Sequence, residues 1–258
     1  MNDVSVVLVT YNSEHYIRTC LDALAEAQVR DVVVVDNNSH DSTRAILSEF
    51  SSLTVILNDT NRGYTQAVNQ GVRATGTPYI LVLNPDVEIS ADTIQVLVSE
   101  LHTDPRVGIA APKLVYPDGK LQYSCRRFPT FFTFLLRGLG CTEARAWMPR
   151  LLHRHLMTEY DHVQPLDVDW VLGACMLIRR DMLTSIGLLD ESYFLYYSDI
   201  DLCLRANRAG WKVRYEPRAT AIHQYGRVSA QNRLSNPATR SHIRSALRFF
   251  WRQLTKAV

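Results

Sequence analysis

The chain has 258 residues, 47% of them hydrophobic, which is enough for one large α/β domain with a sizeable core. Its net charge of +2 is too small to indicate a nucleic-acid partner, and none is expected. The five cysteines are scattered and lack C-x-x-C spacing. This pattern argues against a disulfide framework or a zinc site and predicts a reducing compartment.

The amino terminus carries an acid at position 3 and only a short apolar run, so it does not resemble a signal peptide. No apolar stretch reaches the ~18 residues that a membrane-spanning helix needs. We therefore expect a cytoplasmic protein, soluble or peripheral on the inner face of the cell membrane.

Short β-branched runs alternate with segments of helical periodicity in the first part of the chain. The predicted strands are Val4–Thr10, Asp31–Asp36, Leu53–Leu57 and Ile80–Asn84, and the predicted helices are Glu14–Ala27, Asp41–Phe50 and Tyr64–Ala74. This alternation predicts an α/β fold whose central sheet is mostly parallel and Rossmann-like, with helices on both faces.

The stretch YILVLNPDVEI reads as a buried central strand that stops at Asn84-Pro85-Asp86, because proline lacks a backbone donor. Ligands of open α/β sheets bind outside the carboxyl ends of the strands, so Asp86 stands where a ligand would lie. A carboxylate there suits a hard divalent cation that bridges to a diphosphate. The competing interpretation is an ordinary Asn-Pro-Asp turn.

Small polar residues follow the other predicted strands as well. They are Thr10, Asn12 and Ser13 after the first strand, Asp36 and Asn37 at the second, and Asn58, Asn61 and Gly63 after the third. Such groups can bind a nucleoside and its phosphates. Helix capping is the alternative for Ser13, Ser42 and Thr43, but Asp36 closes a strand and does not open a helix. The chain has no G-x-G-x-x-G and no P-loop, which disfavours dinucleotide and P-loop sites.

Two further groups of candidate residues lie in the second half. Asp199 and Asp201 stand at the start of a predicted helix, Asp201–Ala209, where acids are also favoured by the helix dipole. His223 follows a predicted strand, Lys212–Ala221, although a satisfied polar role is commoner for such a histidine. Val168–Arg179 reads as one buried strand, in which Trp170 either packs in the core or faces a ligand.

The C-terminal segment Arg240–Lys256 contains no acid, and a basic residue recurs at every fourth position. Its apolar stripe is predicted to comprise Ile243, Leu247, Phe250 and Leu254, with Trp251 on the border. This basic amphipathic helix suits an anionic membrane surface, or it docks on the domain. Residues 123–162 show no clean period and fit an acceptor-side loop, a membrane-proximal helix or a plain insertion.

Seven motifs together resemble the inverting family-2 glycosyltransferases of the GT-A fold, and most of all the bacterial rhamnosyltransferases of polysaccharide and cell-wall assembly. The motifs are VSVVLVTYN, VVVVDNNSHDST, NRGYTQAVNQG, YILVLNPDVEI, VDWVLGACMLIRRD, GLLDESYFLYYSDIDLCLRANRAGW and HQYGRVS. They occur in the family's order and extend from about Val4 to Ser229.

The resemblance implies roles for particular residues. It implies a nucleotide site of Thr10, Asn12, Asp36, Asn61, Gly63 and Asn84, a Mg2+ or Mn2+ site of Asp86 and His223, a general base at Asp199, and donor-sugar and acceptor contacts at Trp170, Gly173 and Asp201. Asn84 replaces the first acid of the family's D-x-D element, and Ser198 replaces a glutamate. Asp201 is also interpreted as a structural partner of Arg205, four residues on.

The resemblance implies transfer of L-rhamnose from dTDP-L-rhamnose to a saccharide, carried on a lipid, in the synthesis of a bacterial surface glycan. It implies one GT-A domain over residues 1–235, with a nucleotide-binding half (1–115) and an acceptor half (116–235), followed by the helix of 236–258. A UDP-sugar donor and a non-catalytic sugar-nucleotide-binding module remain alternatives. A sugar nucleotidyltransferase is disfavoured, because VTYNSEHYI has neither the glycine nor the lysine of the basic loop such enzymes carry.

Overall fold

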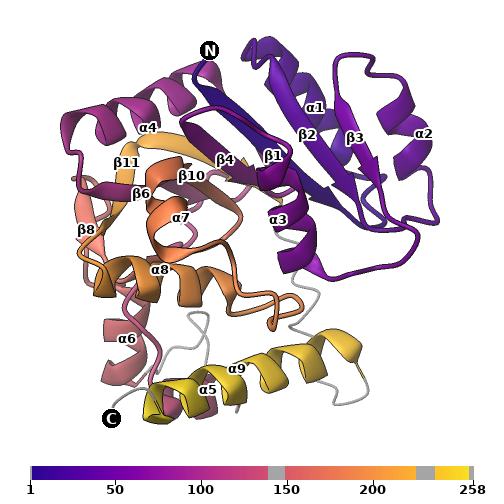
Figure 1. The fold of residues 1–258 in the computed structure, drawn as a ribbon. Helices are drawn as coiled ribbons and strands as arrows, with labels where there is room; N and C mark the ends of the chain where they lie inside the picture. Colours follow the sequence, from indigo (N-terminus) through magenta and orange to yellow (C-terminus); the bar gives the residue numbers. More distant parts are fainter. Residues whose placement is uncertain (1, 139–148, 225–235, 256–258) are drawn as a thin grey trace.

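The structure is a computed structural model that describes residues 2–138, 149–224 and 236–255. A central sheet runs through it, with helices on both sides (Figure 1). The strands are β1 (Val4–Thr10), β2 (Asp31–Asp36), β3 (Thr54–Leu57), β4 (Tyr79–Leu83), β5 (Val87–Glu88), β6 (Val107–Val115), β7 (Cys125–Arg126), β8 (Leu166–Val168), β9 (Trp170–Val171), β10 (Cys175–Arg179) and β11 (Lys212–His223). The helices are α1 (Ile17–Glu26), α2 (Thr43–Ser48), α3 (Tyr64–Arg73), α4 (Ala91–Thr103), α5 (Phe131–Gly138), α6 (Arg150–Leu156), α7 (Arg180–Ile186), α8 (Ser198–Arg208) and α9 (Pro237–Thr255).

The main sheet has the strand order β3-β2-β1-β4-β10-β6-β11-β5, with β8 paired to β11. Strands β1 to β4 are mutually parallel, and β11 is parallel to β6, whereas β10, β5 and β8 pair antiparallel with their neighbours. The predicted mostly parallel α/β sheet is therefore confirmed. In the register of β1 with β2, Thr10 lies beside Asp36, so the polar strand ends meet at one edge.

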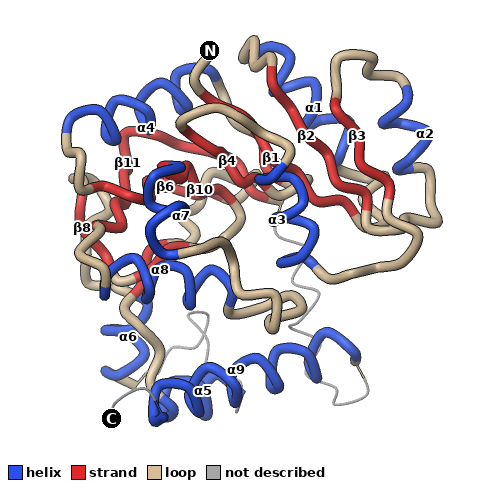
Figure 2. Tube along the Cα trace, in the orientation of Figure 1, coloured by secondary structure: helices blue, strands red, loops and turns tan. Residues whose placement is uncertain are grey.

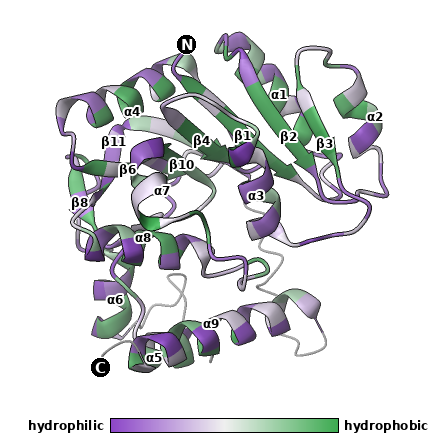
Figure 3. Ribbon diagram, viewed as in Figure 1, coloured by the Kyte–Doolittle hydropathy of each residue, from purple (hydrophilic) through white to green (hydrophobic). Residues whose placement is uncertain are grey.

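Two layers of helices cover the sheet because its central strands are apolar on both faces. Val6 and Leu8 of β1 pack in the core shared with α1, α2 and α4, while Val7 and Val9 pack in the core shared with α3, α7 and α8. Figure 2 shows the strands between these helices, and Figure 3 shows their hydrophobic colouring. In the described residues no helix combines the length and the apolar character that crossing a membrane requires.

The prediction of one strand over Val168–Arg179 is wrong. The chain leaves β8 of the main sheet, forms β9 in a separate two-stranded sheet with β7, and returns to the main sheet at β10. The intervening turn brings the Gly173 backbone against Asp199, and an uninterrupted strand could not make this contact. Apolar composition did not reveal the break, because both β9 and β10 are buried.

Other predicted boundaries shift by a few residues. Helix α8 begins at Ser198, not at Asp201, so Asp199 lies in its first turn. Strand β11 continues beyond Ala221 to His223. Helix α1 begins at Ile17, later than predicted, and Ser13 does not cap it. Of the motif HQYGRVS, the residues after Gln224 lie outside the described residues, as does Lys256 of the predicted C-terminal helix.

Candidate active site

Asp36, at the end of β2, is completely buried, and its carboxylate is the centre of a hydrogen-bond network. Its Oδ2 accepts hydrogen bonds from the hydroxyls of Thr10 (3.1 Å) and Ser39 (2.5 Å), and its Oδ1 accepts one from the Ser39 backbone N–H (3.1 Å). The Arg44 guanidinium reaches Oδ1 at 2.6 Å, and the pair is half-buried on the arginine side. Asp36 thus holds the loop after β2 in place, whatever it contacts in a bound ligand.

The small polar residues after β1 and β2 bond one loop to the other. The backbone N–H of Asn12 donates to Ser39 Oγ (2.9 Å), and the Asn12 side chain accepts from the His40 N–H (2.9 Å). The Ser13 N–H donates to Thr43 Oγ1 at 2.8 Å. Asn12 also has a left-handed backbone, with φ of 51°. These loops therefore form one cross-linked wall, and neither Ser13 nor Ser42 makes a side-chain cap bond.

A second wall is built from asparagines. Asn61 Oδ1 accepts from the Asn37 side chain (3.1 Å) and from the Gly63 N–H (2.9 Å). Gly63 has φ of +86°, and a Cβ there would lie 2.6 Å from the Phe194 ring. Glycine is thus required by this close approach, in addition to the predicted approach of a nucleotide. Asn37 is a site residue that the motif match did not assign, since nothing local distinguishes it from its neighbour Asn38.

Asp86 and His223 come together because β5 pairs with the end of β11, with Val87 opposite His223. The His223 Nε2 atom lies 3.4 Å from Asp86 Oδ2. On the other side of the ring, Nδ1 lies 2.9 Å from Gln122 Oε1, and the Gln122 amide N–H donates to the His223 carbonyl. Because the Gln122 amide nitrogen donates to the His223 carbonyl, the atom that faces Nδ1 is the Gln122 amide oxygen. An amide oxygen only accepts hydrogen bonds, so Nδ1 carries the proton.

This arrangement fits a divalent metal. The His223 Nε2 atom and the Asp86 carboxylate lie close enough to bind the same cation, while Gln122 fixes the tautomer and the ring orientation. The described residues contain no group of three or more His, Cys, Asp or Glu side chains that could hold a metal. Phosphate and water oxygens would therefore complete the coordination shell, as is usual for Mg2+ and Mn2+. Asn84 is half-buried two residues before Asp86. It stands where a D-x-D element has its first aspartate, so this edge of the site has one negative charge fewer than such an element.

Asp199, in the first turn of α8, is held by backbone donors. Its Oδ2 accepts from the Gly173 N–H (3.0 Å), and its Oδ1 accepts from the Ile200 N–H (2.9 Å). Burial raises the pKa of the Asp199 carboxyl above its ordinary value, although these backbone hydrogen bonds oppose the shift. A carboxylate whose pKa is raised toward neutrality is a stronger proton acceptor, as a general base requires.

Tyr64 contacts the turn that holds Asp199. Its hydroxyl donates to the Gly173 carbonyl at 3.2 Å, so the carbonyl of Gly173 holds Tyr64 and its N–H holds Asp199. Burial raises the pKa of the Tyr64 hydroxyl, and the negative charges of Asp199 and Asp86 raise it further. The Asn84 N–H, two residues before Asp86, donates to the Ala174 carbonyl at 2.8 Å, next to Gly173. The segment that leads to the predicted metal ligand therefore adjoins the turn that holds the predicted base, and Tyr64 is a contact of that turn that sequence reasoning missed.

Trp170 and Asp201 make structural contacts. The Trp170 ring is only 4% exposed, its indole N–H donates to the Arg127 carbonyl (2.9 Å), and the Arg126 guanidinium lies 5.2 Å from its centroid. Asp201 pairs with Arg205 at 2.8 Å, the predicted i,i+4 ion pair. Their contacts with a donor sugar or an acceptor stay predictions.

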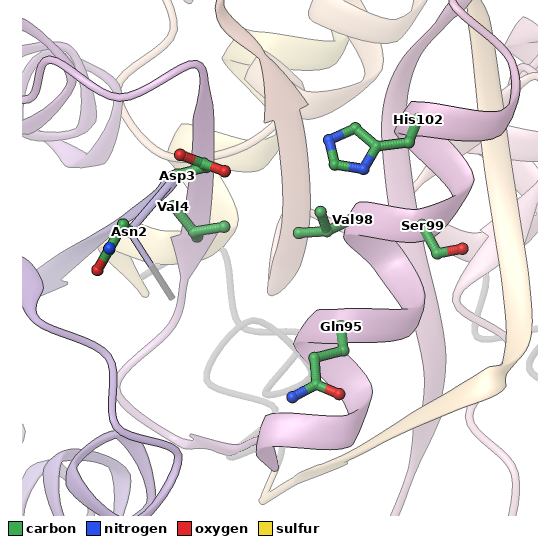
Figure 4. A pocket seen from close by; sticks show the side chains of 7 residues that line it. All are labelled: Asn2, Asp3, Val4, Gln95, Val98, Ser99 and His102. Carbon is green, nitrogen blue, oxygen red and sulfur yellow. The ribbon is translucent and has the colours of Figure 1, made fainter.

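A pocket elsewhere on the molecule is unrelated to these residues. Figure 4 shows it between the start of β1 and one face of α4. Its lining residues are Asn2, Asp3, Val4, Gln95, Val98, Ser99 and His102. Because β1 begins at Val4 and reaches Thr10 at its carboxyl end, this pocket lies at the opposite edge of the sheet from the candidate active site.

Solved structures support the fold. The chain matches GalNAc-T7, solved with UDP, GalNAc and Mn2+, at a TM-score of 0.64 and 15% identity, over 86% of this chain and 44% of that one. It matches the mannosyltransferase PcManGT from Pyrobaculum calidifontis, solved with GDP-Man and Mn2+, at a TM-score of 0.59 and 20% identity, over 87% of this chain and 57% of that one. The chain thus spans about half the length of these two solved chains, and the likeness shows a GT-A fold.

Sequence comparison goes further. The N-acetylglucosaminyl-diphospho-decaprenol L-rhamnosyltransferase of Mycobacterium tuberculosis is 30% identical over 92% of this chain and 81% of its own length. The rhamnosyltransferase WbbL of Escherichia coli K12 is 27% identical over 97% of this chain and 93% of its own. The family model "Glycosyl transferase family 2" matches residues 5–187, which is more than half of the chain. The chain therefore belongs to glycosyl transferase family 2 and is a glycosyltransferase.

Proposed function

We propose that this protein transfers L-rhamnose from dTDP-L-rhamnose, with inversion, to a saccharide carried on a lipid diphosphate at the inner face of the cell membrane, in the synthesis of a bacterial surface glycan. Two adjoining contacts support the chemistry: the Asn84 N–H, two residues before Asp86, donates to the Ala174 carbonyl at 2.8 Å, and the neighbouring Gly173 N–H donates to Asp199 at 3.0 Å. The names of the two rhamnosyltransferase relatives favour this donor. The relative from Mycobacterium tuberculosis favours the lipid-linked acceptor.

In the proposed reaction, the Asp199 carboxylate accepts the proton of the acceptor hydroxyl as that oxygen forms its bond to the anomeric carbon. The bond from this carbon to the diphosphate oxygen breaks on the opposite face, so the configuration inverts in one displacement. Gly173 and Ile200 orient the carboxylate through their N–H groups. A divalent metal held by Asp86 and His223 would supply positive charge to the departing diphosphate.

The loops after β1, β2 and β3 are proposed to bind the nucleotide. Thr10, Asn12, Asp36, Asn61 and Gly63 are locked to one another or to their neighbours, so this wall is preformed before a donor arrives. Preformed walls lower the ordering cost of binding. We assign residues 1–115 to this nucleotide-binding half, residues 116–235 to the acceptor half and residues 236–258 to the C-terminal helix.

The test is product formation with purified protein, Mn2+ or Mg2+, and a panel of dTDP- and UDP-sugars with a lipid-diphosphate saccharide acceptor. The proposal expects metal-dependent turnover with dTDP-L-rhamnose and inverted stereochemistry at the anomeric carbon. Faster turnover with a UDP-sugar would refute the donor assignment and leave the transferase intact. Binding of sugar nucleotides with no transfer to any acceptor would favour the non-catalytic module instead.

A further inference from the structure

Helix α9 has one face docked on the catalytic domain. Ser245, Ala246 and Phe249 are buried, and Ala246 and Phe249 belong to the same core cluster as α8. The Phe249 ring packs 5.4 Å from that of Tyr197, two residues before Asp199. The predicted apolar stripe is therefore wrong as a description of the docked face, because Leu247 and Leu254 point away from it and remain exposed.

The opposite face of α9 is open and amphipathic. Its exposed residues are Arg240, Arg244, Leu247, Trp251 and Leu254, which follow one another at helical spacings of three or four. Leu247 is 53% exposed, Trp251 68% and Leu254 73%. The face is thus basic toward its amino end and apolar toward its carboxyl end.

Helix α5 packs beside α9 and carries exposed apolar side chains of its own. The Phe250 ring of α9 lies 5.8 Å from Phe131 and 6.1 Å from Phe134 of α5, and the two helices run beside each other at the lower end of the molecule in Figure 1. On α5, Phe132 is 69% exposed and Leu135 43%. Large apolar side chains from two helices, far apart in sequence, therefore gather at one end of the molecule, beside the helix that carries Asp199.

The positive charge of α9 indicates which kind of partner its open face binds. The described part of α9 contains four arginines and no acid. Arg248 and Arg252 bond back to the domain at Ser192 and Asp190, whereas Arg240 and Arg244 lie on the open face. Neither α5 nor the described part of α9 carries an acid, so this face of a second copy would offer the arginines no opposite charge, whereas an anionic lipid surface would.

We propose that the open α5–α9 face, formed by Phe132, Leu135, Arg240, Arg244, Leu247, Trp251 and Leu254, binds the surface of an anionic phospholipid bilayer. The leucines and aromatic rings enter the boundary between headgroups and acyl chains, and the arginines contact lipid phosphates. This inference rests on the proposed function, since a surface beside α8 would hold Asp199 close to an acceptor anchored in the same bilayer.

The test is co-sedimentation of the full chain with vesicles of phosphatidylglycerol and phosphatidylcholine, compared with vesicles of phosphatidylcholine alone. We expect binding to the anionic vesicles that weakens as salt is raised. The triple change Leu247→Ser, Trp251→Ser and Leu254→Ser should weaken binding more than tenfold. The double change Arg240→Gln and Arg244→Gln should weaken it about thirtyfold, because each arginine near such a surface contributes about a fivefold factor.

Matched controls lie at other parts of the fold. Leu57, at the end of edge strand β3, is 57% exposed, and Leu57→Ser should leave vesicle binding unchanged. The double change Arg30→Gln and Arg106→Gln removes the same charge near the amino ends of β2 and β6 and should weaken binding far less. Thermal unfolding checks that every variant is folded. Wild-type binding that is absent, or equal for neutral vesicles, would overturn the proposal, as would a wild-type dimer that the triple change converts to a monomer.

Turnover separates this inference from the proposed function. With an acceptor embedded in anionic vesicles the triple variant should lose activity, whereas with a water-soluble, short-chain acceptor it should match the wild type. Equal loss with both acceptors would contradict a membrane role for the face. Vesicle binding with no rhamnosyl transfer to either acceptor would refute the proposed function and leave the membrane surface standing.

Discussion

Asp36 and Asp199 are both carboxylates of the candidate site, but their surroundings differ. Asp36 accepts hydrogen bonds from two hydroxyls and a backbone N–H and pairs with Arg44, so its charge is compensated inside the protein. The hydrogen bonds given to Asp199 come from two backbone N–H groups, and burial raises the pKa of its carboxyl. A compensated carboxylate stabilises a loop, whereas an under-compensated one is ready to accept a proton.

The largest effect is expected for Asp199→Asn. The amide cannot accept the acceptor's proton, so kcat should fall by about 10²–10⁴-fold. The pKa of Asp199 is raised in the folded protein, so its ionised form costs stability as pH rises through that pKa. The variant should therefore unfold at the same temperature as the wild type or higher at neutral pH. A lower unfolding temperature, with retained turnover, would reverse our comparison of the two carboxylates.

The same shift predicts the pH dependence of turnover. The base works only when ionised, so kcat should fall as pH is lowered through the pKa of Asp199, which lies above that of an ordinary aspartate. The measurement is kcat against pH at saturating donor and metal. In the Asp199→Asn variant this acid limb should disappear from the residual activity. If the acid limb persisted in the Asp199→Asn variant, the titrating group would be a residue other than Asp199.

Asp36→Asn should chiefly affect stability. The change removes the negative partner of Arg44 and disturbs the bonds of Thr10 and Ser39, at a cost of about 2 kcal/mol in the free energy of unfolding. Urea denaturation measures this loss, and donor KM should rise because the loop after β2 loosens. The companion change Arg44→Met tests the pair from its other side. Unchanged stability of both variants would show that the network is not what holds the loop.

Gly173→Ala should impair turnover without unfolding the protein. An added Cβ would lie 3.2 Å from the Asp199 Cβ and 3.4 Å from its Oδ2, so the carboxylate must shift. We expect kcat to fall about tenfold, with donor KM little changed. Gly63→Ala is the matched contrast, because its positive φ and the Phe194 backbone leave no room, and that variant should lose stability. Loss of stability at position 173 instead would mean that the glycine serves folding.

The smallest effect is expected for Tyr64→Phe. Phenylalanine keeps the ring but loses the hydrogen bond to the Gly173 carbonyl, which should lower kcat about threefold to fivefold. The readout is the split between kcat and KM, since a residue that positions Asp199 should leave donor KM unchanged. A rise in donor KM with constant kcat would place Tyr64 in the donor pocket and not behind the base.

Local patterns were sufficient to predict much of this protein. The alternation of β-branched runs with helical segments predicted the parallel half of the sheet, and the halt at Pro85 placed Asp86 at a strand end. These features depend on neighbours in the chain, since side-chain period and the missing proline donor act over a few residues. The strand break after Val171 was missed, because two successive buried strands have the same apolar composition as one longer buried strand.

The contacts that complete the site were decided by the tertiary structure alone. Gln122 meets His223 across 101 residues of chain, and Tyr64 meets Gly173 across 109. The docked face of α9 was likewise set by Tyr197 and its neighbours, because a helix with apolar residues on two sides does not by itself specify which side is buried. The sequence by itself determined the elements and the acids at their ends. Which side chains meet depended on long-range packing, which no local period encodes.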